Sequence, residues 1–258
     1  MSVPLIDTHA HLNFSPFYEN PEPYLERAHN NGVRAVIVPG VDIPSSEKAL
    51  RLADRFSMVY AAAGIHPEDS LKAPDDYMKQ LEAFYQHDKC VAAGEIGVDF
   101  YRDYAPPDVQ ERFFREQAEL AKSLGLPMII HNRQADNVIL SVLDKVGYFK
   151  GQCHCYTGKA PFALKCIDKG LLISFTGIVT FSKEIAATVS ALPLQSLMIE
   201  TDSPFMAPVP FRGKTNEPSF VMKVAEKYAE IFNIPVDEVA RICTGNALNL
   251  FHKLKTDE

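Results

Sequence analysis

The stretch PPDVQERFFREQAELAKSLGLPMIIH, residues 106–131, holds the clearest helix and the clearest strand of the sequence in direct succession. Its first part has apolar residues at helical spacing, namely Val109, Phe113, Leu120, Ala121 and Leu124. Asp108 at the start, Gly125 just past the end and Pro127 beyond it are typical helix boundaries. Pro127–His131 is then almost continuously apolar, which predicts a strand buried on both faces of a parallel sheet.

The same alternation of strand and helix fills the chain. Further short apolar runs predict strands at Val3–Asp7, Arg34–Val38, Met58–Ala63, Cys90–Gly94, Gly151–Cys155, Leu171–Phe175 and Leu197–Asp202. Helical patterns occupy Glu22–Asn31, Ser45–Phe56, Asp75–His87, Gln134–Val146, Pro161–Lys169 and Lys183–Ala191, and Glu217–Phe232, Val236–Thr244 and Ala247–Lys253 follow the last strand. Eight strands each followed by a helix predict the α/β class and a (β/α)₈ TIM barrel. We interpret residues 1–258 as a single domain, since no linker or charge block interrupts the pattern.

Composition excludes several classes of protein. The 258 residues are 47% hydrophobic and 23% charged, which rules out a disordered chain, and the net charge of −7 argues against bulk electrostatic binding of nucleic acid. No apolar run is long enough for a membrane span, and the start MSVPLIDTHAHL does not resemble a signal peptide. Five cysteines, an odd number without a disulfide framework, indicate reduced thiols and a cytoplasmic location.

Two histidines follow the first predicted strand, in the order Asp7-Thr8-His9-Ala10-His11. Side chains two residues apart in a strand point to the same side, so both imidazoles can converge on one metal ion. By itself this pattern is weak, because two partly exposed loop histidines would have the same spacing.

The other predicted strands also end in polar residues. Glu95 follows the fourth, and burying it without a partner would be costly, so it either binds a metal or pairs with a lysine or arginine. His131 ends the fifth strand. His154 lies in the sixth, where alternation predicts that Cys153 and Cys155 face away from it and pack in the core. A Cys/His zinc site is the competing interpretation there, but the sequence offers no second pair of ligands.

The eighth strand completes the set with Glu200 and Asp202, which share a face, Asp202 being nearer the carboxyl end. Active sites of (β/α)₈ barrels lie at the carboxyl ends of the strands. We therefore expect six side chains to meet there: His9, His11, Glu95, His131, His154 and Asp202. Four imidazoles and two carboxylates gathered without cations would be unfavourable, so they predict a site for one or two divalent metal ions.

Candidates for substrate contact lie around the same rim. His66 follows the third strand and Arg133 follows the fifth. Arg212, Lys214 and Asn216 lie in the long loop after the eighth strand. Arginine offers a planar fork that suits phosphate or carboxylate, and long loops in compact domains are often functional. For Lys214, an ordinary solvated surface charge is an equally good interpretation.

With these residues assembled, the chain resembles the TatD family of metal-dependent deoxyribonucleases, within the wider amidohydrolase-like barrels. The matching segments are DTHAHL (7–12), GIHP (64–67), GEIGVDFY (94–101), QERFFREQAELAKSLGLPMIIHNR (110–133), HCYTG (154–158), ETDSPFMAP (200–208), RGKTNEP (212–218) and TGNALNLF (244–251). They span nearly the whole chain in order. Ala10, where the family usually has cysteine, and Phe100, where tyrosine is more usual, are small departures.

The resemblance implies hydrolysis of phosphodiester bonds in DNA, often as a 3′ exonuclease on single-stranded or frayed ends. It implies one metal ion, magnesium, manganese or zinc, on His9, His11, Glu95 and Asp202, and a second on Glu95, His131 and His154. Asp202 and Glu95 would be catalytic, with Asp202 accepting a proton from water. His66, Arg133, Arg212 and Asn216 would contact phosphate, and Asp7 and Glu200 would orient imidazoles.

Two other functions stay open on the sequence. One is a small-molecule amidohydrolase or phosphoesterase on the same barrel; many such enzymes use a carbamylated lysine on the fourth strand, where this chain has Glu95. The other is a non-catalytic interaction scaffold, which predicts missing ligands. A monomer is the default expectation for the oligomeric state.

Overall fold

The computed structural model describes residues 3–102 and 104–255, and within these ranges eight parallel strands form one sheet in the order β1 to β8. They are β1 (Leu5–Asp7), β2 (Val33–Pro39), β3 (Val59–Ala63), β4 (Cys90–Asp99), β5 (Met128–Arg133), β6 (Gly151–Cys153), β7 (Leu172–Phe175) and β8 (Leu197–Ile199). The sheet returns on itself just beyond β1 and β8: the Thr8 amide donates to the carbonyl of Ile199 at 3.3 Å, and Ala10 pairs with Ser203 in a parallel bridge. The predicted (β/α)₈ TIM barrel is confirmed.

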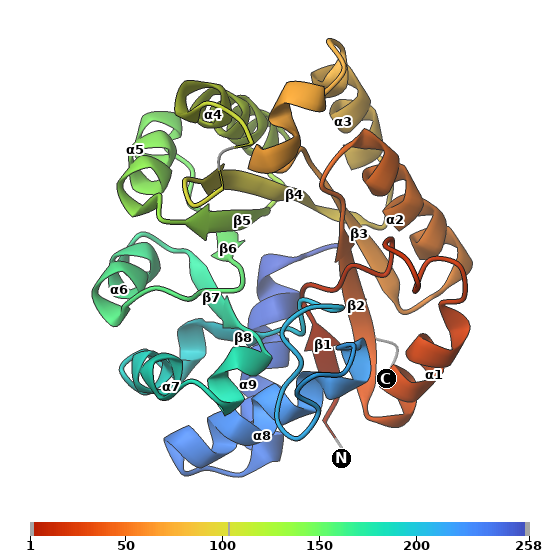
Figure 1. The fold of residues 1–258 in the computed structure, drawn as a ribbon, viewed down its shortest axis with the longest axis vertical. Helices are drawn as coiled ribbons and strands as arrows, with labels where there is room; N and C mark the ends of the chain where they lie inside the picture. The colour runs from red at the N-terminus through yellow and green to blue at the C-terminus, as the bar shows by residue number, and fades with distance from the viewer. Residues whose placement is uncertain (1–2, 103, 256–258) are drawn as a thin grey trace.

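Helices surround the strands, as Figure 1 shows in a view onto the barrel. They are α1 (Glu22–Asn30), α2 (Ile43–Arg55), α3 (Tyr77–Tyr85), α4 (Pro107–Leu124), α5 (Asp136–Val146), α6 (Ala160–Asp168), α7 (Lys183–Ser190), α8 (Val221–Phe232) and α9 (Val236–Leu250). Short 3₁₀ turns are η1 (Pro67–Lys72), η2 (Gly177–Thr180), η3 (Leu194–Ser196) and η4 (Pro218–Phe220). Within the described ranges, no helix combines the length and the apolar character that crossing a membrane requires.

The helix boundaries predicted around residues 106–127 are confirmed. Helix α4 begins at Pro107 and ends at Leu124, and Gly125 follows it with a φ of 66°. Glycine adopts this left-handed conformation without the steric penalty of a Cβ atom, so it stops the helix and turns the chain toward β5.

Apolar side chains fill the interior of the barrel and its amino end. Ile37 and Met198 of the strands pack in one buried cluster with Leu250 and Phe251, which close the end of α9. Two hydrogen bonds hold α9 at the amino ends of the strands, from Thr244 Oγ1 to the carbonyl of Pro4 and from Asn246 Nδ2 to the carbonyl of Leu197, each 2.7 Å. The amino end is therefore closed, and the carboxyl end is left for polar groups.

One sequence prediction about this closure is wrong. The sequence pattern predicts two helices, Val236–Thr244 and Ala247–Lys253, with a break at Gly245, whereas α9 runs continuously to Leu250. A glycine in a helix interior costs only about 1 kcal/mol relative to alanine. Packing of Cys243 and Ala247, both buried, outweighs that cost.

Several strands differ in length from the prediction. Strand β4 continues five residues past Gly94 to Asp99, so Glu95 lies inside the strand and not after it. Strands β6 and β8 end earlier than predicted, at Cys153 and Ile199. His154 and Asp202 therefore lie in the loops that leave these strands.

A capping box at the start of α2 gives a stability prediction. The Asp42 carboxylate accepts from the Ser45 amide at 2.8 Å, and the Ser45 hydroxyl accepts from the Asp42 amide at 3.0 Å. We expect Asp42→Ala to lower the free energy of unfolding by about 1 kcal/mol, measured by urea denaturation. The matched control is Asp76→Ala, because Asp76 precedes α3 without a capping hydrogen bond within the described residues. Equal losses in the two variants would contradict a capping role for Asp42.

Candidate metal centre

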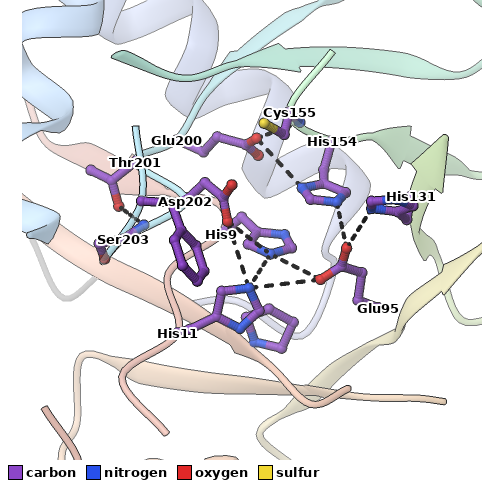
Figure 2. A network of polar contacts seen from close by, with 12 residues as sticks. His9, His11, Glu95, His131, His154, Cys155, Glu200, Thr201, Asp202 and Ser203 are labelled. Carbon is purple, nitrogen blue, oxygen red and sulfur yellow. Dashed lines mark hydrogen bonds and ion pairs between the residues drawn. The ribbon is translucent and has the colours of Figure 1, made fainter. Parts of the chain in front are cut away.

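Side chains from five different parts of the barrel meet at the carboxyl ends of the strands (Figure 2). They come from the segment after β1, from within β4 and β5, and from the segments after β6 and β8: His9 and His11, Glu95, His131, His154, and Asp202. The structure thus brings together the six residues that the sequence analysis selected as metal ligands.

One group of ligand atoms surrounds the first two histidines. The Nε2 atoms of His9 and His11 lie 3.1 Å apart. Glu95 Oε2 lies 3.4 and 3.7 Å from these two nitrogens. Asp202 Oδ1 lies 3.8 and 3.6 Å from them. Most of these distances are too long for good hydrogen bonds but short enough for atoms that share one ion.

A second group surrounds the other oxygen of the same carboxylate. Glu95 Oε1 lies 2.9 Å from His131 Nδ1 and 2.7 Å from His154 Nε2. His66 Nε2 is also near, at 3.4 Å. The two oxygens of Glu95 therefore face two different sets of imidazole nitrogens, which is the arrangement of a bridging ligand.

The donor set and its burial fit a metal ion. Ligand nitrogens lie about 2.0–2.1 Å from a bound zinc ion, so the atoms of one ligand set lie roughly 3 to 3.5 Å from each other. His9 is fully buried, and Glu95 and Asp202 are 3% and 8% exposed. Ligand atoms of His9, His11 and Asp202 all lie within 4.8 Å of one another, as do those of His66, Glu95 and His131. The residues present can therefore hold one or two divalent cations.

Burial and neighbouring charges set the protonation of the ligands. Burial lowers the pKa of His11 to about 3, so this imidazole is neutral and its lone pairs are free to bind a cation. Burial would raise the pKa of Glu95, but the charges of His154 and His66 and hydrogen bonds from His131 and His154 hold it well below its usual range. Burial raises the pKa of Asp202 to about 6. Metal ions bind neutral imidazoles and ionised carboxylates, which are the forms that His11 and Glu95 hold here. Burial would lower the pKa of His131 and His154, but the neighbouring carboxylates raise it, so these two imidazoles must release a proton when a metal ion binds.

Two further carboxylates contact the ligating imidazoles from outside. Asp99 Oδ2 lies 3.0 Å from His131 Nε2, and Glu200 Oε1 lies 3.7 Å from His154 Nδ1. The hydrogen bond between Asp99 and His131 fixes the orientation of that ring and raises its basicity, whereas Glu200 lies beyond hydrogen-bond distance of His154. Asp99 is not among the residues predicted from the sequence, although it lies four residues after Glu95, on the same face of a strand that continues that far.

Asp7, which was expected to orient an imidazole, has other partners. Its carboxylate accepts hydrogen bonds from the amide and hydroxyl of Thr201 at 2.9 and 2.6 Å, and from the amide of His9 at 3.4 Å. Among the described residues no hydrogen bond joins Asp7 to an imidazole ring, so the expectation is wrong: Asp7 instead joins the segments that follow β1 and β8.

The predicted substrate contacts fall into two pairs. A cavity of about 440 Å³ opens above the ligands, and both His66 and Arg133 line it. Arg212 and Asn216 are not among the described residues that line this cavity. Arg212 instead lies over the ring of Phe181, 3.8 Å from its centroid.

Asn216 is fully buried behind the loop that follows β8. Its amide nitrogen donates to the carbonyls of Thr201 and Phe205 at 2.8 and 2.5 Å, and its oxygen accepts from the Glu217 amide at 3.0 Å. All of its polar atoms are thus engaged in shaping the loop, which carries Phe205 to the rim of the cavity.

The expectation that both cysteines beside His154 face away is half wrong. Cys153 is buried in the core, whereas Cys155 lines the cavity with His154. Strand alternation no longer applies after Cys153, where β6 ends, and Cys155 adopts a φ of 43°. Its amide donates to Glu200 Oε1 at 2.5 Å, which fixes this turn.

A TIM barrel with a buried His, Asp and Glu cluster at the carboxyl ends of its strands is the architecture of a metal-dependent enzyme. Comparison with known proteins gives the family. Residues 6–252 match the model of the TatD-related DNase family. The chain therefore belongs to this family, and it is a metal-dependent hydrolase.

Individual relatives cover nearly the whole chain. The Bacillus subtilis (strain 168) metal-dependent hydrolase YabD, named as uncharacterized, is 40% identical over 251 residues, 96% of this chain and 98% of YabD. The Salmonella typhimurium protein named 3′-5′ ssDNA/RNA exonuclease TatD is 31% identical over 96% of this chain and 98% of that protein. Among solved structures, the TatD homologue YjjV of Escherichia coli K12 superposes with a TM-score of 0.91 at 32% identity, covering 96% of this chain and 98% of YjjV.

Proposed function

We propose that this protein hydrolyses phosphodiester bonds in DNA as a 3′ exodeoxyribonuclease that acts on single-stranded or frayed ends. The observation that carries the proposal is the carboxylate of Glu95, whose two oxygens face two separate sets of imidazole nitrogens at the floor of an open cavity. Two cations held side by side suit a phosphodiester, because they can stabilise both the attacking and the leaving oxygen. The exonuclease name of the Salmonella relative supports the same substrate class.

The ligands divide between two metal positions. His9, His11, Glu95 and Asp202 would hold one ion, and Glu95, His131 and His154 would hold the other. Nitrogen and oxygen donors accommodate zinc, manganese and magnesium. When bound, these ions supply Lewis acidity that makes water a better nucleophile and offsets the charge of the phosphate.

The protein's own side chains supply proton transfer and positioning. Asp202 is only 8% exposed yet lines the cavity, so its carboxylate can take the proton of the attacking water. His66 and Arg133 contact the phosphate from the cavity wall. Arg212, predicted from the sequence as a phosphate contact, lies over Phe181 and outside the wall of this cavity, and Asn216 fixes the shape of the loop after β8.

The net charge of −7 does not oppose this function. An enzyme that binds only the end of a DNA strand needs positive electrostatic potential only at its cavity. The metal ions and Arg133 supply that potential. Every ligand comes from one chain, so we propose that a monomer is active. All five cysteines are free thiols, which supports a reducing compartment such as the cytoplasm.

Metal removal tests the proposal. We expect the chelator-treated protein to lose cleavage of end-labelled single-stranded DNA, and magnesium, manganese or zinc, added back singly, to restore it. Release of mononucleotides from the 3′ end, followed on denaturing gels, is the expected product pattern. Parallel reactions with single-stranded RNA and with bis(p-nitrophenyl) phosphate separate DNA from RNA and from small phosphodiesters. Cleavage of the small diester alone would contradict the nuclease proposal.

A further inference from the structure

A second cavity, of about 700 Å³, adjoins the one above the metal ligands. The two share Asn132, Arg133 and Thr157 as a common wall. The chemistry proposed above uses only the first cavity. We propose that the second cavity binds the base and sugar of a nucleotide adjacent to the scissile phosphate, so that this chain recognises polynucleotides and not isolated phosphodiesters. This inference rests on the proposed nuclease function.

Aromatic side chains from the segment after β4 form one side of the second cavity. Phe100 and Tyr101 line it and are 36% and 60% exposed. The guanidinium carbon of Arg133 lies 3.8 Å from the centroid of the Tyr101 ring. Exposed aromatic rings and arginine planes are the surfaces on which proteins stack unpaired bases. Because Arg133 also lines the first cavity, it can contact a phosphate there while its partner Tyr101 contacts the neighbouring base.

The second cavity also offers polar groups that suit a base or sugar better than a second phosphate. Asn132 Nδ2 donates to Asp136 Oδ1 at 2.8 Å, and both residues line the cavity. The Asp136 carboxylate can accept a hydrogen bond from a base amino group or a sugar hydroxyl. The Asp136 carboxylate would repel a phosphate group, so phosphate stays with Arg133 and the metal ions.

The size of the second cavity agrees with one nucleotide. Pockets for small molecules and cofactors measure about 300–1,000 Å³. Arg133 lines both cavities, so the two cavities are neighbours. A DNA strand whose scissile phosphate lies over Glu95 can therefore place the adjacent nucleotide in the second cavity.

Steady-state kinetics of the metal-reconstituted protein test the inference on two substrates, a single-stranded oligothymidylate and methyl p-nitrophenyl phosphate, a small diester whose one aromatic ring is the leaving group. We expect Tyr101→Ala to lower kcat/KM for the oligonucleotide about 10- to 100-fold, since base stacking on one aromatic ring accounts for an effect of this size. The small diester lacks a base, so its kcat/KM should be unchanged. Tyr101→Phe should behave as the parent, because it keeps the ring.

Tyr104→Ala is the matched control. Tyr104 is 59% exposed on the same segment, but it is not among the described residues that line either cavity. This variant should cleave both substrates at the parental rate, and all variants should keep parental metal content.

Oligonucleotides with an abasic residue provide a second readout that needs no protein variant. An abasic residue at the 3′ terminal or at the penultimate position should slow the parent about as much as Tyr101→Ala does, and the variant should not distinguish that substrate from the intact one. Equal rates on intact and both abasic strands would overturn the inference, as would equal losses on both substrates in Tyr101→Ala. Either of these results would leave the nuclease proposal intact. If the parent protein cleaves only the small diester, the nuclease proposal and the inference about the second cavity are both contradicted.

Discussion

The variant Glu95→Gln is expected to lose both metal ions and to cleave single-stranded DNA about 10³-fold more slowly than the parent, or worse. An amide has the same shape as the carboxylate, but it presents one nitrogen that binds no metal and carries no charge. Since Glu95 faces His9, His11, His131 and His154, one change weakens both metal positions. Groups that only orient a ligand are already worth 10–100-fold in metal affinity or activity, so the loss of a shared ligand should exceed that range.

Metal content, measured by elemental mass spectrometry after gel filtration, is the primary readout, and cleavage of end-labelled DNA is the second. The control is Glu68→Gln, because Glu68 lines the same cavity but its carboxylate bonds the exposed side chain of Arg102 at 3.3 Å. This variant should keep metal and activity. A folded Glu95→Gln protein that holds two equivalents of metal and cleaves at the parental rate would contradict the assignment of Glu95, and a contaminating nuclease would then explain the activity.

The barrel was predictable because its signals are local and repeated. Each strand reads as an apolar run and each helix carries its own boundaries, as Asp108 and Gly125 do for α4. Once eight such units are recognised, the parallel order of the strands follows from the fold class. Convergence of His9, Glu95 and Asp202 then needs no long-range information, because the carboxyl ends of all strands face the same side.

Features that depend on where a strand stops were not predictable in the same way. Alternation predicts Cys155 in the core, yet it faces the cavity because β6 ends two residues earlier. A fourth strand that ends at Gly94 gives no reason to select Asp99, which lies at the end of the longer β4. In both cases hydrogen bonding with the neighbouring strand decides the end, and that pairing leaves no local trace in the sequence.

Contacts between distant loops were out of reach as well. The sequence shows Asn216 only as a polar residue in a long loop, yet it is buried and donates hydrogen bonds to the carbonyls of Thr201 and Phe205. Arg212 reads as an anion-binding side chain, yet it lies on Phe181, a residue of the segment after β7. Neither partner is adjacent in sequence, so only the folded chain shows which polar residues of the loop point at the cavity and which fix the loop itself.

The substitution Gly97→Ala is expected to lower the free energy of unfolding by about 3–5 kcal/mol, or to prevent folding. Gly97 lies between Glu95 and Asp99 in β4, with a φ of 146° that side-chain-bearing residues rarely adopt. A Cβ atom there would lie 2.0 Å from the carbonyl oxygen of His131 on β5. Because this obstacle is backbone, relief requires β4 and β5 to separate where both carry candidate metal ligands. Urea denaturation followed by circular dichroism measures the loss.

Two other glycines separate the contributions to this effect. Gly125 has a φ of 66°, but a Cβ atom added to it would meet no described heavy atom within 4 Å, so Gly125→Ala should cost about 1 kcal/mol from backbone strain alone. Gly245 in α9 has open space and no positive φ, so Gly245→Ala should stabilise by about 0.5–1 kcal/mol. Insolubility of Gly97→Ala under conditions that yield both controls counts as the expected result. A Gly97→Ala protein as stable as Gly125→Ala would contradict this prediction. It would show that β4 and β5 can separate at His131 at little cost in free energy. Their close approach would then not be what holds Glu95 and His131 beside each other.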